Sequence, residues 1–198
     1  MSYIILGLGN PGQEYEDTRH NTGRFVLGIV AKELNADEFS FNKKINALST
    51  EAKIKKEKLI LAMPETFMNN SGKTAAALVK SIKAASRLIV IYDDFSLPIG
   101  RMKISFNRSS GGHNGLESII KAVKTEAFLR IRVGIAPENS KGDAKVPHGD
   151  DKVLKFILGK YTDDELKLIK KVAKKAAEAI LVIVTESKEK AMSVFNAL

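Results

Sequence analysis

The side chains in this sequence that are suited to acyl-transfer chemistry follow its apolar runs. They are two histidines, one carboxylate and three amides: His20, His113, Asp93, Asn10, Asn69 and Asn114. Asn10 and His20 come soon after the apolar residues 3–6, and Asp93 directly follows the apolar residues 88–92. Branched apolar runs of this length are typical of buried strands, and ligands bind where the strands of open α/β sheets end. We therefore expect these side chains to converge.

A histidine–carboxylate pair with amides nearby is suited to activating water. Imidazole, with an ordinary pKa of about 6.5, accepts a proton from water at neutral pH. A carboxylate fixes the tautomer of the imidazole and stabilises the imidazolium that forms, and asparagine N–H groups bind a developing oxyanion. The sequence has no cysteine and no G-x-S-x-G motif, so no protein nucleophile is evident. Direct attack by activated water is the simplest chemistry that these residues predict.

Each of these side chains also has a structural interpretation. Asn69 is a candidate helix cap, Asn10 precedes a proline as turn residues often do, and Asp93 is placed to bond the backbone of the next turn. His148 stands alone in a polar segment, and we expect no role for it. The three histidines are dispersed and lack H-E-x-x-H spacing, so the sequence predicts no metal site. Residue chemistry alone leaves a basic α/β protein, with hydrolase activity as one interpretation.

The glycines after the first apolar run also satisfy a dinucleotide-binding pattern. Gly7, Gly9 and Gly12 match G-x-G-x-x-G after a predicted strand. Against this, Pro11 removes a backbone N–H that should donate to a pyrophosphate, and residues 13–20 lack the apolar periodicity of a helix. A dinucleotide-dependent enzyme is therefore a minor alternative, which a cofactor-binding measurement would distinguish.

The charge balance favours a polyanionic partner. Thirty-two Lys and Arg residues against 23 acidic residues give a net charge of +9. This excess is typical of nucleic-acid-binding proteins, but a lysine-rich solubilising surface explains it equally well. The sequence has no signal-peptide pattern, no cysteine and no apolar run long enough to span a bilayer. We therefore expect a cytoplasmic protein without membrane contact.

Hydrophobic periodicity predicts strands interleaved with helices in a single domain over residues 1–198. Predicted strands cover residues 3–6, 47–54, 58–63, 88–92, 101–106 and 128–135. Predicted helices cover residues 22–34, about 69–85, 116–123, 151–158, 162–185 and 188–198. The second and third strands form a predicted hairpin, and residues 39–45 and 139–151 are predicted loops. This order indicates an α/β fold in which helices surround a twisted mixed β-sheet.

Five blocks of the sequence resemble, in order, the motifs of the bacterial peptidyl-tRNA hydrolase family. The blocks are residues 7–23, 64–72, 93–100, 111–116 and 130–135. The resemblance extends over residues 3 to about 160, and the total length also suits the family. It implies hydrolysis of the ester that joins a peptide to the 3′ ribose of tRNA, which recycles prematurely dropped peptidyl-tRNA.

The resemblance also implies a role for each matching residue. His20 would be the base that activates water, and Asp93 its partner. The residues implied to bind peptidyl-tRNA are Asn10, Tyr15, Phe67, Asn69, Asn114 and, with a less defined role, His113. The asparagines would position the peptide, the terminal nucleotide and the water. The family implies a monomer that needs no metal or other cofactor.

A basic pair, Lys103 and Arg132, stands at or near the positions with which this family binds the 5′ phosphate of tRNA. The sequence departs from the family at two places, because Ser105 replaces an often basic residue and Ser96 an often acidic one. The first departure weakens the expected phosphate clamp unless another cation compensates. The candidates for compensation are Arg101 and Arg108.

The main alternative of a different class is a non-enzymatic RNA-binding module whose loops cradle a single-stranded RNA end. The chain lacks the aromatic strand of RNP-type modules, and residues 111–114 are not a G-x-x-G loop followed by a basic helix. The presence of both His20 and Asp93 favours an enzyme over such a module.

Overall fold

Seven strands within residues 2–197, the part of the chain that the computed structural model describes, form one sheet in the order β2-β3-β4-β1-β5-β7-β6. The strands are β1 (Tyr3–Gly7), β2 (Ser40–Asn42), β3 (Ala47–Ile54), β4 (Glu57–Pro64), β5 (Leu88–Pro98), β6 (Met102–Phe106) and β7 (Leu129–Ala136). β1 pairs in parallel with β4 and β5, and β5 with β7, whereas β2–β3, β3–β4 and β6–β7 are antiparallel. The sheet is mixed, and the predicted hairpin β3–β4 is confirmed.

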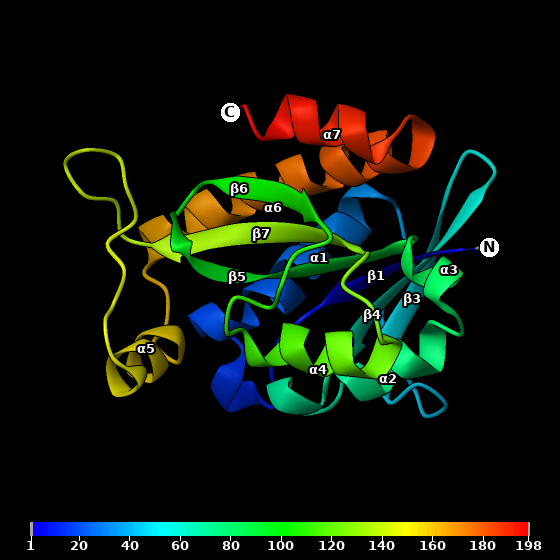
Figure 1. Ribbon diagram of the computed structural model, residues 1–198, viewed down its shortest axis with the longest axis horizontal. Helices are drawn as coiled ribbons and strands as arrows, with labels where there is room; N and C mark the ends of the chain where they lie inside the picture. The colour runs from blue at the N-terminus through cyan, green and yellow to red at the C-terminus, as the bar shows by residue number, and fades with distance from the viewer. Residues whose placement is uncertain (1, 198) are drawn as a thin grey trace.

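Helices cover both faces of this sheet (Figure 1). The helices are α1 (Thr22–Glu33), α2 (Gly72–Leu78), α3 (Ile82–Ala85), α4 (Asn114–Val123), α5 (Asp150–Ile157), α6 (Asp163–Thr185) and α7 (Lys188–Phe195), with 3₁₀ turns η1 (Gln13–Tyr15), η2 (Arg19–Asn21) and η3 (Met68–Asn70). One buried apolar cluster lies between the sheet and α1, α6 and α7, and a second lies between the sheet and α2 and α4. The predicted α/β fold is confirmed.

The central strand β1 shows why the sheet has a core on each side. Successive side chains of a strand point to opposite faces. Ile5 accordingly belongs to the cluster beneath α1, and Ile4 and Leu6 belong to the cluster beneath α2 and α4. Because β1 and β5 are parallel, their carboxyl ends meet at one edge of the molecule. This is the edge at which the polar residues of the candidate site are expected.

Gly23 lets α1 begin directly against the ends of β1 and β5. A Cβ atom at this position would overlap the backbone oxygen of Ile91 and the backbone of Leu8. The N–H of Arg24 donates to the carbonyl of Leu8 at 3.0 Å, which fixes the approach. The turn η2, which comes immediately before α1, is thereby held against β5.

The helix predicted over about residues 69–85 is wrong as a single element, because the chain is split there into α2 and α3. α2 ends at Leu78, and the next residue, Val79, takes an extended conformation with φ −96° and ψ 98°. A β-branched residue loses little by leaving a helix. Ser81 then caps α3, its Oγ accepting the N–H of Ala84 at 3.1 Å.

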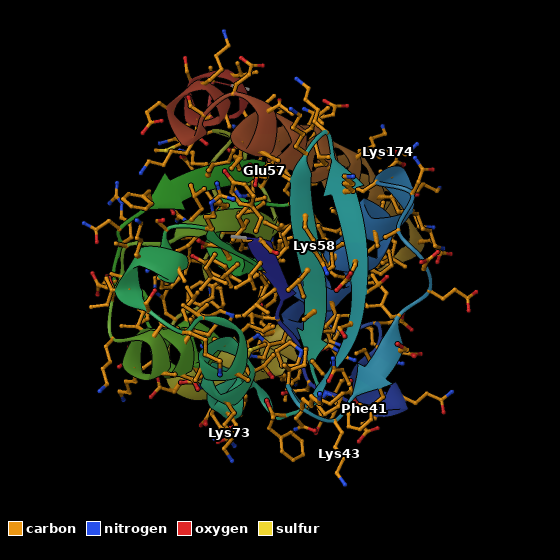
Figure 2. All side chains as sticks on the ribbon, turned by 90° about the vertical axis from the view of Figure 1, so that its right-hand side faces the viewer. Phe41, Lys43, Glu57, Lys58, Lys73 and Lys174 are labelled. Carbon is orange, nitrogen blue, oxygen red and sulfur yellow. The ribbon has the colours of Figure 1, made fainter. Side chains whose placement is uncertain are left out.

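Two further boundaries differ from the prediction. Residues 39–45, predicted as a loop, contain β2, a short strand at one edge of the sheet. Phe41 on this strand is 58% exposed, and Figure 2 shows it with Lys43 at the periphery of the molecule. β5 runs on to Pro98 rather than ending near residue 92, so Asp93 lies inside a strand and not after one.

The predicted C-terminal helices are present, although α7 ends at Phe195 and residue 198 of the predicted range lies outside the described residues. Thr162 and Glu165 form a capping box at the start of α6. After α7 the side-chain amide of Asn196 accepts the N–H of Ile104 at 2.7 Å and donates to its carbonyl at 2.9 Å. Ile104 belongs to β6, the other edge strand, so Asn196 takes the place of a neighbouring strand. Among residues 2–197, no helix is both long and apolar enough to cross a membrane.

Candidate active site

His20 and Asp93 lie side by side where η2 packs on β5. Nδ1 of His20 is 3.1 Å and 3.0 Å from the two carboxylate oxygens of Asp93. Both residues are buried, with 8% of His20 and 2% of Asp93 exposed. An ionised carboxylate only accepts hydrogen bonds, so Nδ1 carries the proton and Nε2 has the lone pair. The predicted pair is thus brought together in the form that accepts a proton from water.

The two side chains also shift each other's protonation. Burial alone would raise the pKa of Asp93, but His20 and His113 outweigh burial and hold this pKa below its usual range. Burial alone would lower the pKa of His20, and the charge and hydrogen bond of Asp93 outweigh that effect and raise it. Asp93 therefore stays ionised at neutral pH, and His20 is a stronger base than a free imidazole.

His113 contacts the same carboxylate from the other side. Its Nε2 is 3.1 Å from Oδ1 of Asp93, and its ring centroid lies 5.1 Å from that of His20. Its Nδ1 accepts the N–H of Leu116 at 3.3 Å and so caps α4. The sequence assigned His113 to substrate binding, but these contacts give it a place beside Asp93.

The cluster of His20, Asp93 and His113 also places three candidate metal-binding atoms within 4.8 Å of one another. The prediction that the histidines are dispersed is therefore wrong for this pair, whereas His148 lies apart in the 139–149 loop. A metal ligand must present a lone pair. His113 would have to move its proton from Nε2 to Nδ1, where it would face the Leu116 N–H. These three side chains are therefore arranged for hydrogen bonds to Asp93. They could bind a metal ion only if the hydrogen bond between His113 and the Leu116 N–H were broken.

Asn10 is held by a network of its own. Its Oδ1 accepts the N–H of Met68 at 2.8 Å. Its backbone N–H donates to Oδ1 of Asn21 at 2.8 Å, and its carbonyl accepts from Nδ2 of Asn21 at 2.9 Å. Nδ2 of Asn10 makes no hydrogen bond within the described chain, so this amide group is available to a ligand. Sequence reasoning missed Asn21, which directly follows His20 and holds the Asn10 loop.

The remaining predicted substrate residues border the same region. The rings of Tyr15 and Phe67 meet edge to face with centroids 6.5 Å apart, and Phe67 is 59% exposed. Asn69 follows Met68, the residue that Asn10 binds. Asn69 and Asn114 are both exposed and line one groove between α2 and α4. Oδ1 of Asn69 accepts a hydrogen bond from Nδ2 of the neighbouring Asn70 at 3.3 Å, and neither Asn69 nor Asn114 is bonded to the buried pair.

A cavity of about 220 Å³, here called the Arg130 pocket, opens beside Asp93 and His113. Its cationic lining residues are Arg108, Arg130 and Arg132. Lys103 faces Arg132 across the antiparallel pair β6–β7, so the predicted basic pair is adjacent in the sheet. Arg132 is already engaged, because its Nε donates to Oδ2 of Asp94 at 2.7 Å.

Arg130 is the cation that sequence reasoning missed. It lies directly opposite Ser105 in the β6–β7 register and is only 1% exposed. Its Nη1 donates to the carbonyl of Ser109 at 2.7 Å. Its Nε and Nη2, and the Ser105 hydroxyl, are buried without a hydrogen-bond partner among residues 2–197. Of the predicted compensating residues, Arg108 lines the pocket, whereas Arg101 pairs with Glu138 outside it at 2.6 Å.

A sequence model of the family described as peptidyl-tRNA hydrolase matches residues 4–198. The chain belongs to the peptidyl-tRNA hydrolase family. The peptidyl-tRNA hydrolase of Caldanaerobacter subterraneus subsp. tengcongensis is 42% identical over 195 residues, which cover 98% of this chain and 99% of the relative. That of Aquifex aeolicus is 39% identical over 194 residues, covering 98% and 95% of the two chains. The resemblance found in the five sequence blocks is thereby confirmed.

The fold agrees with a solved structure of the same family. The crystal structure of peptidyl-tRNA hydrolase from Acinetobacter baumannii superposes with a TM-score of 0.87 at 27% identity. The superposition covers 99% of this chain and 95% of the other. The mixed sheet with helices on both faces is therefore the fold of peptidyl-tRNA hydrolases.

Proposed function

We propose that this protein hydrolyses the ester bond between a peptide, or an N-blocked aminoacyl group, and the 3′ ribose of tRNA. The observation that carries the proposal is the buried hydrogen-bonded pair His20–Asp93. Family membership indicates the substrate class, and the pair supplies a base suited to activating water. The reaction releases free tRNA and peptide, and so recycles peptidyl-tRNA that has dropped prematurely from translation. We further propose that the enzyme acts as a monomer in the cytoplasm.

The reaction begins when Nε2 of His20 takes a proton from water and the water oxygen attacks the ester carbonyl. Asp93 stabilises the imidazolium through the Nδ1–H bond and holds the ring in place. The tetrahedral intermediate collapses with cleavage of the bond to the ribose 3′ oxygen. The imidazolium returns its proton to that oxygen, which leaves as a hydroxyl, and the other product is the peptide carboxylic acid, which ionises.

The asparagines would position the reacting groups. Nδ2 of Asn10 is oriented by the Met68 bond and is available to a peptide carbonyl or to the oxyanion. Asn69 in η3 and Asn114 at the start of α4 line the groove between α2 and α4, and would hold the terminal nucleotide and the water. The exposed Phe67 ring, supported by Tyr15, is suited to stacking against a base or packing on a peptide side chain.

The basic residues beside the pair would bind the acceptor end of tRNA through its 5′ phosphate. Lys103 and Arg132 provide the predicted clamp. Ser105 stands where relatives often have a second basic residue, so the clamp has one cation fewer. Arg130, directly opposite Ser105, offers two unpartnered guanidinium nitrogens in the same pocket. Guanidinium groups suit phosphate because they donate two parallel hydrogen bonds. The net charge of +9 is consistent with a polyanionic substrate.

The sequence alternatives have less support than hydrolysis. A dinucleotide site needs a helix whose N-terminus faces the pyrophosphate after Gly12, and only the short 3₁₀ turn η1 (Gln13–Tyr15) stands there. An RNA-binding module without catalysis would not need an ionised carboxylate buried against a histidine, since burying such a charge is costly.

The deciding experiment measures release of tRNA from a labelled N-blocked aminoacyl-tRNA. The wild type is compared with His20→Ala, with and without a chelator. We expect chelator-resistant hydrolysis that disappears in the variant, while tRNA binding is retained. A folded wild type that binds tRNA but does not hydrolyse the ester would favour the RNA-binding module. Activity that survives in His20→Ala would remove His20 from the role of base.

A further inference from the structure

We propose that His113 is a positioning residue for the ester hydrolysis, because its neutral imidazole holds Asp93 in the orientation that keeps His20 ready to accept a proton. The kinetic part of this inference rests on the proposed function. The proton position on which it is based belongs to the free protein and is measurable without substrate.

The geometry shows one carboxylate shared by two rings. Oδ1 of Asp93 is 3.1 Å from Nδ1 of His20 and 3.1 Å from Nε2 of His113, while Oδ2 is 3.0 Å from Nδ1 of His20. Asp93 is 2% exposed, so few water molecules can donate hydrogen bonds to its carboxylate. A buried carboxylate needs donors from the protein. With His20 alone, both oxygens of Asp93 would share the single donor Nδ1, and the carboxylate would be less restrained in rotation about its Cβ–Cγ bond.

The N-terminus of α4 determines which nitrogen of His113 carries the proton. Nδ1 accepts the backbone N–H of Leu116 at 3.3 Å, and an acceptor nitrogen cannot carry a proton. The proton of the neutral ring therefore lies on Nε2, which points at Asp93. A second proton on Nδ1 would break the cap and would face the positive end of the helix dipole. In the neutral ring, the helix thus places the donor of His113 on Nε2, facing Asp93.

Two tyrosines also face this cluster. The Tyr92 ring lies edge-on to His113 with centroids 4.9 Å apart, and burial raises the pKa of Tyr92 to about 12. Burial likewise raises the pKa of Tyr161, whose hydroxyl bonds Thr22. The charged groups that act on these two tyrosines are Asp94, Arg130, Arg132, Arg19 and Glu165.

Loss of the His113 donor has two consequences for the pair. The Asp93 carboxylate becomes free to rotate, which lowers kcat because His20 is held less well. The Asp93 carboxylate also accepts one hydrogen bond fewer, so its negative charge attracts the imidazolium of His20 more strongly. The pKa of His20 therefore rises, and the acid limb of the kcat/KM profile moves to higher pH. A residue that only binds substrate would raise KM and leave this limb in place.

Two substitutions of His113 test its two hydrogen bonds separately, the one to Asp93 and the one from the Leu116 N–H. His113→Asn keeps an oxygen at the position of Nδ1, able to cap α4, and loses the donor to Asp93. His113→Gln places an amide N–H at the position of Nε2 and loses the cap. We expect His113→Asn to lower kcat about tenfold to hundredfold, as loss of a hydrogen bond to a charged group does, and to shift the acid limb upward. We expect His113→Gln to recover much of kcat and to restore the limb.

Ser81→Ala is the matched control, because it removes a helix cap from α3 without touching the site. We expect it to reduce stability slightly with an unchanged pH profile. An unaltered kcat and acid limb in His113→Asn, or a rise in KM alone, would overturn the inference.

A measurement on the unmutated protein tests the tautomer directly. The ¹⁵N NMR signals of the neutral His113 ring should show a protonated Nε2 and an unprotonated Nδ1. Finding the proton of the neutral ring on Nδ1 would overturn the inference. Failure of the wild type to hydrolyse peptidyl-tRNA would count against the proposed function instead, and the NMR result would still decide the tautomer.

Discussion

Asp94 and Arg132 form an ion pair across the neighbouring strands β5 and β7, with Nε of Arg132 donating to Oδ2 of Asp94 at 2.7 Å. Ser96 joins them, its hydroxyl bonding Oδ1 of Asp94 at 2.6 Å and Nη2 of Arg132 at 3.2 Å. Asp94 directly follows Asp93 in β5. The residue that orients the proposed base and the residue that orients the proposed phosphate ligand are therefore neighbours in one strand.

Arg132→Ala should mainly weaken substrate binding. Arg132 lies in the Arg130 pocket and not against His20, so its loss removes a contact that is made equally before and during the reaction. We expect KM to rise about tenfold to hundredfold with kcat nearly unchanged, as for loss of a hydrogen bond to a charged group. Steady-state kinetics on N-blocked aminoacyl-tRNA measure both constants. Arg101→Ala is the control, because Arg101 is exposed and pairs with Glu138 outside the pocket. A fall in kcat at constant KM would contradict a binding role for Arg132.

Binding of tRNA should weaken as the salt concentration rises. Cations that contact phosphates displace condensed counterions, and the logarithm of the affinity falls linearly with the logarithm of salt. Arg132→Ala should make this slope shallower by roughly one phosphate contact. Titrations of catalytically inactive His20→Ala with tRNA over a range of salt concentrations measure the slope without turnover. An affinity that does not depend on salt would remove the phosphate contacts from the proposal.

The pH profile of kcat/KM should have an acid limb set by His20. His20 must be neutral to accept a proton, and Asp93 raises its pKa above the ordinary value of 6.5, so activity should fall as pH drops through that raised pKa. In Asp93→Asn the burial of His20, which lowers its pKa, is no longer opposed by the carboxylate. We expect the limb to move to lower pH and kcat to fall by at least about a hundredfold. A limb that stays in place in Asp93→Asn would show that another group controls it.

Gly23→Ala should destabilise the protein, whereas Gly28→Ala in the same helix should not. A methyl group at Gly23 would overlap the backbone of Ile91 and Leu8, and overpacking of this kind costs about 1–3 kcal/mol. At Gly28 the nearest atom to a new Cβ is the terminal carbon of Met63 at 3.8 Å, so alanine should stabilise by roughly 0.5–1 kcal/mol. Urea denaturation measures both free energies of unfolding. Equal effects at the two positions would contradict the packing of α1 on the strand ends.

The elements that could be predicted from the sequence are those specified by local pattern. The apolar run of β1, the 3.6-residue periodicity of α1 and the capping box at Thr162 each carry their signal within a few residues. The break between α2 and α3 was missed because Val79 and Ser81 lie in a segment that still has helical periodicity. The edge strand β2 was missed because its three residues are all exposed and show no alternation.

The residue types of the site were predicted from the sequence, but the contacts between several of these residues were not. The pairing of His20 with Asp93 was expected because both follow apolar runs predicted as strands, and the resemblance named it, although the structure places His20 in η2 and Asp93 within β5. The contact between His113 and Asp93 depends on how α4 docks on the sheet, which no local pattern specifies. Arg130 was missed for a related reason. A basic residue between apolar neighbours in β7 is expected on an exposed face, and only the register with Ser105 shows that it is buried beside a cavity.

The side-chain amide of Asn196 occupies the backbone N–H and carbonyl of Ile104 on the edge strand β6. An unpaired edge strand can recruit a strand from another molecule and start aggregation. A shortened chain that ends at Phe195 would uncover these two groups while keeping the active site intact. Loss of solubility after such a truncation would then arise from the exposed edge strand and not from a damaged core. For the same reason, an affinity tag should be attached after Asn196 and should not replace it.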